Sequence, residues 1–218
     1  MNVKPVRVIS TLFIILKMFI LVLGGSGSGK SERAEEAVKS LSKGQPAYYL
    51  ATMRRDGEEA ERRISRHRSL RQGKGFITIE LPFRVDRLEK RRELRDATVL
   101  LECLSNLVAN ELFPREGDGL PDPFRQAEGA EAFLYPRLKR EMDTMLDLPR
   151  NLVVVTNDIF GEGLLSGDEH DDPYIKSYLS ILAKLNNYLA ARADQVVEAV
   201  VGIPVVRKGA IWHYSGLS

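Results

Sequence analysis

A glycine-rich segment, Gly24–Ser31, constrains the fold of this 218-residue chain more than any other feature. Its sequence, GGSGSGKS, fits the pattern G-x-x-x-x-G-K-[ST]; the apolar run of residues 18–23 precedes it, and an apolar spacing typical of a helix follows at residues 34–41. In that context glycines let the backbone wrap around a phosphate, and the helix N-terminus adds its partial positive charge. The segment therefore predicts a phosphate-binding loop rather than a turn that merely caps a helix.

The loop also carries groups that nucleotide chemistry requires. Lys30 can reach the terminal phosphates of a nucleoside triphosphate, and the Ser31 hydroxyl can ligate Mg²⁺. Glu102 follows the apolar run of residues 98–101, at the strand edge where parallel sheets bind ligands, so we expect it to hold Mg²⁺ together with Ser31. Asp158 follows a similar run, and for this residue a ligand role and a helix cap are equally good interpretations.

Short apolar runs and helical spacings alternate along the rest of the chain. Runs rich in Val, Ile and Leu, typical of strands buried on both faces, cover residues 18–23, 47–52, 76–81, 98–103, 152–156 and 195–202. Amphipathic helices are predicted between them, including ones through residues 138–146 and 174–189. The order predicts one α/β domain, a mostly parallel sheet with helices on both faces. Residues 114–131 are predicted to form a loop, and residues 203–218 to add a terminal hairpin.

The N-terminal apolar run, residues 8–23, contains Lys17 and is shorter than the roughly 20 residues of a membrane-spanning helix. Basic residues precede it, as in a signal peptide, but no small-residue cleavage site separates it from the glycine-rich loop. Its second half is better interpreted as the first strand. We therefore expect residues 1–17 to be an extension, with Met18 as an alternative start, and residues 18–218 to form the nucleotide-binding catalytic domain. Stable membrane insertion is not expected.

Composition limits the partners and the compartment. The net charge of +2 provides no overall attraction to nucleic acid, so no nucleic-acid partner is expected. Cys103 is the only cysteine, which excludes an internal disulfide and a cysteine-rich metal site. A reducing compartment follows from this cysteine usage, and we expect a cytoplasmic protein.

A basic segment contains a histidine in unusual surroundings. Residues 58–71, EEAERRISRHRSLR, are predicted to form a helix in which His67 shares a face with Ile64 and Leu70 and is flanked by arginines. From the residues alone, a solvated basic helix with a packed histidine is the more frequent case. The alternative is a nucleophile or general base among phosphate-binding arginines, because a neutral imidazole can attack phosphorus.

Taken together, the segments resemble the bifunctional adenosylcobinamide kinase / adenosylcobinamide-phosphate guanylyltransferase family of cobalamin biosynthesis. The resemblance rests on an ordered set between about residues 18 and 209: FILVLGGSGSGKSERAE, YYLATM, RISRHR, TIELP, LLECLSNLVANELF, VVVTNDIFGEG and LNNYLAARADQVVEAVVGIPVVRKG. The phosphate-binding loop alone would be unspecific, whereas the ordered set is specific.

The resemblance implies a P-loop NTPase core with a RecA-like sheet, and two activities. One phosphorylates the aminopropanol hydroxyl of adenosylcobinamide, a corrinoid, with ATP or GTP. The other transfers GMP from GTP to that phosphate, giving adenosylcobinamide-GDP and pyrophosphate. A homo-oligomer, a trimer, is implied as well.

The resemblance also implies which residues act. A histidine carries GMP covalently in the family, and the matching residue is His67, which reverses the interpretation drawn from its surroundings alone; Lys30 is the second predicted catalytic residue. The predicted nucleotide contacts are Gly24, Gly25, Ser26, Gly27, Ser28, Gly29, Lys30, Ser31, Ala51, Thr52, Met53, Arg68, Ser69, Leu70, Arg71, Glu80 and Glu102. Because His67 must approach the loop to attack the α-phosphorus, nucleotide binding is expected to shift residues 54–75.

Two other interpretations stay open at this point. A different P-loop kinase, acting on another small molecule, would keep Lys30, Ser31 and Glu102 but give His67 no covalent role. A non-catalytic nucleotide-binding module, attached to a membrane through the apolar N-terminus, is the second. The intact Lys30–Ser31 pair favours catalysis over the second interpretation.

Overall fold

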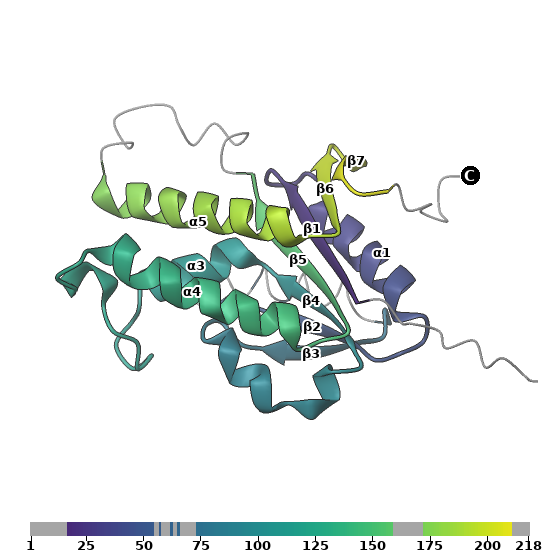
Figure 1. The fold of residues 1–218 in the computed structure, drawn as a ribbon, viewed down its shortest axis with the longest axis horizontal. Coiled ribbons are helices and arrows are strands. Elements are labelled where there is room, and N and C mark those ends of the chain that lie inside the picture. Colours follow the sequence, from purple (N-terminus) through teal and green to yellow (C-terminus); the bar gives the residue numbers. More distant parts are fainter. Residues whose placement is uncertain are drawn as a thin grey trace, which may run out of the picture.

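The computed structural model describes residues 17–54, 57, 62, 65, 73–158 and 172–210, and the structural statements below refer to these residues. They contain one seven-stranded sheet in the order β3-β2-β4-β5-β1-β6-β7 (Figure 1), parallel except for the last pair. Its strands are β1 (Met18–Gly24), β2 (Ala47–Ala51), β3 (Phe76–Glu80), β4 (Thr98–Glu102), β5 (Asn151–Asn157), β6 (Gln195–Val200) and β7 (Ile203–Lys208).

Helices cover both faces of this sheet. One face packs against α1 (Lys30–Ser42), and the other against α3 (Leu104–Leu112), α4 (Ala130–Asp147) and α5 (Pro173–Arg192). Three short 3₁₀ helices complete the described elements: η1 (Val85–Lys90), η2 (Arg92–Leu94) and η3 (Pro123–Arg125). The predicted mostly parallel α/β sheet with helices on both faces is confirmed.

The central strands explain why this arrangement forms. In β1, Ile20 and Val22 pack with Ala34 and Val38 of α1, while the alternate residues of the strand face the layer of α3, α4 and α5. Burial on both faces requires the near-continuous apolar runs seen in the sequence. Each buried Leu, Ile or Val contributes about 1.5–3 kcal/mol to the free energy of unfolding.

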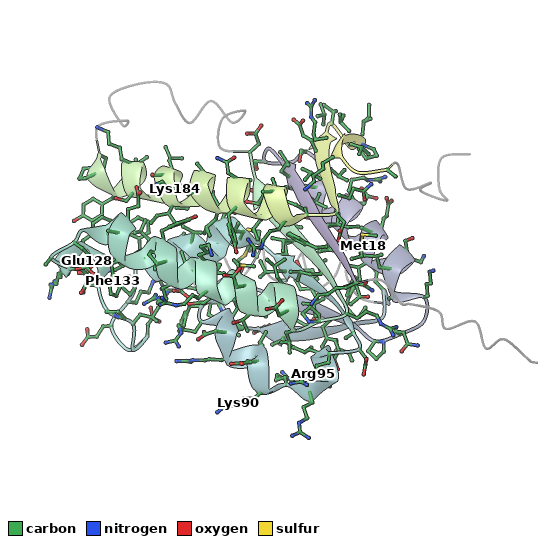
Figure 2. All side chains as sticks on the ribbon, viewed as in Figure 1. Met18, Lys90, Arg95, Glu128, Phe133 and Lys184 are labelled. Atoms are coloured by element: carbon green, nitrogen blue, oxygen red, sulfur yellow. The ribbon has the colours of Figure 1, made fainter. Side chains whose placement is uncertain are left out.

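All six predicted strands are present, with ends within two residues of those expected. Residues 203–208 of the predicted terminal hairpin form β7, which pairs with β6, and residues 211–218 lie outside the described residues. The predicted loop at residues 114–131 is wrong at its end, since α4 already begins at Ala130, and it contains η3. The sequence analysis did not single out α3, although Leu104, Leu107, Val108 and Leu112 follow a helical spacing. Figure 2 shows side chains filling the layer between α4 and α5, and Lys184 of α5 forms an ion pair with Glu131.

Two predictions fall largely outside the described residues. Of the helix expected at residues 58–71, only Arg62 and Ser65 are described, and both are helical. Residues 1–16 lie outside as well, so the division into an extension and a single catalytic domain stays a prediction. Within the described part, no helix combines the length and the apolar composition that crossing a membrane requires.

Two buried glutamates connect the start of η1 to helices α3 and α4. Glu111 of α3 accepts the backbone N–H of Arg84 at 2.7 Å and pairs with Arg137, and Glu141 of α4 accepts the backbone N–H of Val85 at 3.0 Å. These two carboxyl groups thereby satisfy backbone groups where η1 begins. Burial, and secondly the nearby charge of Glu111, raise the pKa of Glu141 to about 9.

We expect the buried Glu111 and Glu141 to make the free energy of unfolding depend on pH. Because the folded-state pKa of Glu141 is raised, its contribution is complete below the unfolded-state value and is lost as pH rises toward about 9. The neutral Glu141→Gln variant should therefore lose less free energy of unfolding than the wild type between about pH 5 and pH 9. Urea denaturation across that range measures how the free energy of unfolding changes with pH in both proteins. Equal changes in the two proteins would contradict the raised pKa of Glu141.

Candidate nucleotide-binding site

The glycine-rich loop joins β1 to α1, as its sequence predicts. Gly29 caps α1 with a φ of 86°, a left-handed conformation that glycine adopts without strain, and a Cβ there would lie 3.0 Å from the Cα of Gly202. At Gly24, a Cβ would lie 2.8 Å from the carbonyl oxygen of Ala199. The loop is thus packed closely against the β6–β7 hairpin, and the N-terminal N–H groups of α1 face the space that the loop encloses.

Lys30 and Ser31, the first two residues of α1, lie at the centre of the site. The Nζ of Lys30 donates to the carbonyl oxygen of Gly25 at 2.8 Å, so its side chain spans the loop. The Oγ of Ser31 donates to the Oε1 of Glu102 at 2.5 Å. This contact between α1 and the end of β4 brings Ser31 and Glu102 together, and their role as ligands of Mg²⁺ stays a prediction.

The donor set suits a hard divalent cation. The second carboxylate oxygen of Glu102, Oε2, is buried without a hydrogen-bond partner, and so is the Oγ of Ser28 in the loop. Buried polar atoms without partners are rare in folded proteins and call for an explanation such as a bound ion. Mg²⁺ commonly takes one or two protein ligands and completes its shell with phosphate oxygens and water. No group of three or more His, Cys, Asp or Glu side chains suited to a metal occurs within the described ranges.

The predicted contact residues on β2, β3 and β4 form one row across the sheet. Ala51 pairs in register with Glu80 on one side and with Glu102 on the other. All three end their strands at the carboxyl edge, where the loop also lies, and Met53 follows Ala51 two positions later. The row therefore brings Glu80 and Glu102 to the same edge as the phosphate-binding loop.

Thr52 holds the backbone of this row together. Its buried Oγ1 accepts the backbone N–H of Cys103 at 2.7 Å and donates to the carbonyl oxygen of Cys103 at 2.8 Å. Its backbone N–H donates to the carbonyl oxygen of Glu102 at 3.0 Å. These bonds fix the end of β4 and hence the position of Glu102.

Thr52→Val keeps the size of this side chain but removes both hydroxyl bonds. We expect it to lower the free energy of unfolding by about 1–3 kcal/mol, since the partly buried N–H of Cys103 loses its acceptor. Thr144→Val is the matched control, because the Thr144 hydroxyl bonds the carbonyl oxygen of Arg140 on an exposed helix surface. Denaturant titration compares the two; equal small losses would show that the Thr52 bonds matter little.

A second network beside Thr52 had no signal in the sequence. Asn110 of α3 donates through Nδ2 to the carbonyl oxygens of Thr52 and Pro82, at 2.7 and 2.8 Å. Arg54 donates to the carbonyl oxygen of Asn110 and pairs with Asp118 at 2.7 Å. The chain just after β2 is thus tied to α3 and to the loop that follows it. These partners lie far apart in the sequence, and no local pattern links them.

The β6–β7 turn also touches the loop, which the sequence did not indicate. The backbone N–H of Gly202 donates to the carbonyl oxygen of Ser28 at 2.8 Å. On the other side, the backbone N–H of Asp158 donates to the carbonyl oxygen of Gly24 at 3.2 Å. Asp158, left open between a ligand and a cap, therefore supports the start of the loop through its backbone.

Cys103 can be set aside as a nucleophile, whereas the histidines lie outside the described residues. Burial raises the pKa of the Cys103 thiol, although its contact with Ser105 acts in the opposite direction, so the unreactive thiol form is favoured. His67 and the predicted contacts Arg68, Ser69, Leu70 and Arg71 fall in ranges that the structure does not describe. Their roles stay predictions.

Comparison with known proteins gives the same assignment as the sequence motifs. The family model described as cobinamide kinase / cobinamide phosphate guanyltransferase matches residues 20–206. The bifunctional adenosylcobalamin biosynthesis protein CobU of Escherichia coli (strain K12) is 31% identical over 188 residues, 86% of this chain and 98% of that protein. The protein of the same name from Salmonella typhimurium (strain LT2) is 30% identical over 196 residues, again 86% of this chain and 98% of that protein.

Two solved structures resemble this chain at much lower sequence identity. The flagellar accessory protein FlaH from Methanocaldococcus jannaschii is 12% identical with a TM-score of 0.43, covering 89% of this chain and 80% of its own. The KaiC-like protein PH0186 from Pyrococcus horikoshii is 13% identical with a TM-score of 0.46, covering 91% and 82%. The family match, by contrast, begins within β1 and ends within β7 and so takes in the whole loop and some part of every strand. Because the match covers most of its length, the chain belongs to the cobinamide kinase / cobinamide phosphate guanyltransferase family, a family of enzymes.

Proposed function

We propose that this protein phosphorylates the aminopropanol hydroxyl of adenosylcobinamide and then transfers GMP from GTP to the new phosphate. The observation that carries the proposal is the Ser31–Glu102 pair, with the second oxygen of Glu102 buried and unpaired beside a complete phosphate-binding loop. Membership of a family described by both activities supports the same conclusion. Both curated relatives are named bifunctional.

In the kinase reaction, the hydroxyl oxygen of the corrinoid attacks the γ-phosphorus. The bond from the γ-phosphorus to the bridging oxygen breaks, the nucleoside diphosphate leaves, and the hydroxyl proton passes to solvent. The loop N–H groups and Lys30 hold the transferring phosphate and offset the negative charge that develops on its oxygens. Such reactions depend mainly on positioning of the reacting groups and neutralisation of the phosphate charge. The loop, which is packed against the β6–β7 hairpin, provides both.

In the transfer reaction, His67 attacks the α-phosphorus of GTP and pyrophosphate leaves. The phosphate on the corrinoid then attacks the same phosphorus, and the bond to the imidazole nitrogen breaks. Two displacements replace one difficult step, which is the usual advantage of covalent catalysis. The guanosine is expected at Ala51, Met53 and Glu80, near residues 68–71.

Ser31 and Glu102 are the residues that would hold Mg²⁺. The cation would offset the charge of the phosphate oxygens when bound. Glu102 contributes its unpaired Oε2, and the Thr52 bonds keep its backbone in place. Cytoplasmic location and a trimeric assembly remain expectations of the same proposal.

Two assays test this function on the full-length chain. With adenosylcobinamide and ATP labelled at the γ-phosphate, the label should appear in the corrinoid. With GTP and Mg²⁺ at neutral to basic pH, intact-protein mass spectrometry should show a gain of one GMP, together with pyrophosphate release. The adduct should be lost in acid, because phosphorus–nitrogen bonds to imidazole are acid-labile, and it should not form with ATP.

The outcomes separate the rival functions. Label transfer without a GMP adduct would favour a kinase in which His67 has no covalent role. Neither label transfer nor adduct, in a protein that binds nucleotide, would favour a non-catalytic module.

A further inference from the structure

An apolar surface lies directly beside the phosphate-binding loop. At the tip of the β6–β7 hairpin, Val200, Val201 and Ile203 are 42%, 87% and 65% exposed. They account for half of the large exposed hydrophobic residues in the described part of the chain. Figure 1 shows this hairpin next to the end of β1 from which the loop departs. The Gly202–Ser28 hydrogen bond of 2.8 Å connects the two directly.

The turn contains a residue that its backbone does not favour. Val201 has a φ of 50° and Gly202 a φ of 80°. Two-residue hairpin turns with positive φ at both positions strongly prefer Asn-Gly, and β-branched residues are outliers in that region. The side chain of Val201 is almost fully exposed and therefore gains little from packing inside this chain. Strained residues of this kind concentrate at ligand sites.

The position of the hairpin indicates which part of a nucleotide it would meet. Lys30 and the Ser31–Glu102 pair define the end of the loop that holds the terminal phosphate. Glu102 belongs to β4, and in the strand order β4 and β6 lie on opposite sides of β1. If the phosphate chain runs from Glu102 along the loop and away from β4, the nucleoside lies beside the β6–β7 hairpin.

The two proposed reactions make opposite demands on one loop. The kinase reaction breaks the bond to the γ-phosphorus, whereas the transfer reaction breaks the bond to the α-phosphorus and retains pyrophosphate in the loop. For the transfer, the guanosine is expected on the other flank, at Ala51 and Glu80, across β4, β5 and β1 from the hairpin. One loop can serve both reactions if the nucleoside has a separate place on each side.

We propose that Val201 and Ile203 form a nucleoside-binding shelf for the triphosphate of the kinase reaction, separate from the guanosine contacts of the transfer reaction. This inference rests on the proposed function. Aliphatic side chains contact the face of a base and its ribose, but they form no hydrogen bonds with the edge of the base. The shelf therefore accepts adenosine and guanosine alike.

The test compares a nucleotide with its phosphate chain alone. Val201→Asn introduces the residue that the turn prefers and removes the apolar side chain. Ile203→Thr makes the side chain more polar but keeps its branching at Cβ. For each variant the dissociation constant of a non-hydrolysable ATP analogue should rise about tenfold. The dissociation constant of inorganic tripolyphosphate should stay within about twofold of wild type, because the phosphates contact the loop and not the shelf.

The matched control is Ile77→Thr, a half-exposed isoleucine on β3 at the other edge of the sheet, which should change neither constant. The rate of GMP-adduct formation should be unchanged in Val201→Asn. Equal weakening of the ATP analogue and tripolyphosphate would mean that the hairpin only supports the loop. A slower GMP adduct would mean that one nucleoside site serves both reactions.

Two further results would also contradict the proposed nucleoside-binding shelf. One is an ATP-analogue affinity equal to wild type in both variants. The other is a change in oligomeric state by size-exclusion chromatography, which would assign the hairpin to a subunit interface. Failure of the proposed function is distinguishable, because it would be seen in the wild-type protein as absent label transfer and absent adduct, with the binding ratios still measurable.

Discussion

Lys30→Ala is expected to lower both proposed activities by about 10²–10³-fold. In the structure the Nζ of Lys30 crosses the loop to the carbonyl oxygen of Gly25, so the charge is held where the terminal phosphates would lie. Label transfer from ATP to adenosylcobinamide and pyrophosphate release from GTP measure the two losses.

Lys39→Ala is the control, because Lys39 lies exposed in the last turn of the same helix, away from the loop. It should leave both rates unchanged. Calorimetric titration with tripolyphosphate should show weaker binding in Lys30→Ala alone. If Lys30→Ala kept its affinity for tripolyphosphate, the loop would not be the phosphate site, and the interpretation of Gly24–Ser31 would be wrong.

The parts of the site that follow from local patterns could be predicted from the sequence. The strand before the loop, the helix after it and the carboxylate after residues 98–101 each depend on a few adjacent residues. Parallel strands end at one edge, so the meeting of Ser31 with Glu102 could be expected without knowing the strand order.

The supports of the site could not be predicted in this way. The bond from Gly202 to Ser28 and the bonds from Asn110 to Thr52 join residues distant in the sequence, and each partner is an ordinary residue in its own segment. Their contact depends on strand order and helix placement, which local periodicity does not contain. The buried Glu111 and Glu141 look like surface residues of amphipathic helices until the 3₁₀ segment is packed against them.

His67→Ala is expected to separate the two activities. The imidazole is proposed to act only in GMP transfer, where it forms and then gives up a bond to the α-phosphorus. Without it, the GMP adduct should disappear from the mass spectrum and formation of adenosylcobinamide-GDP should fall by about 10³-fold or more. Phosphorylation of adenosylcobinamide by ATP should stay within a few-fold of wild type, since Lys30, Ser31 and Glu102 are unchanged.

His170→Ala supplies the control, because that histidine lies in an acidic stretch, GDEHDD, without the arginines that surround His67. It should keep both the adduct and the kinase activity. An adduct that persists in His67→Ala would move the covalent role to another residue. A kinase rate that falls together with GMP transfer would show that the basic segment around His67 is needed to hold the phosphates in both reactions, because arginines that neutralise phosphate charge would serve either displacement.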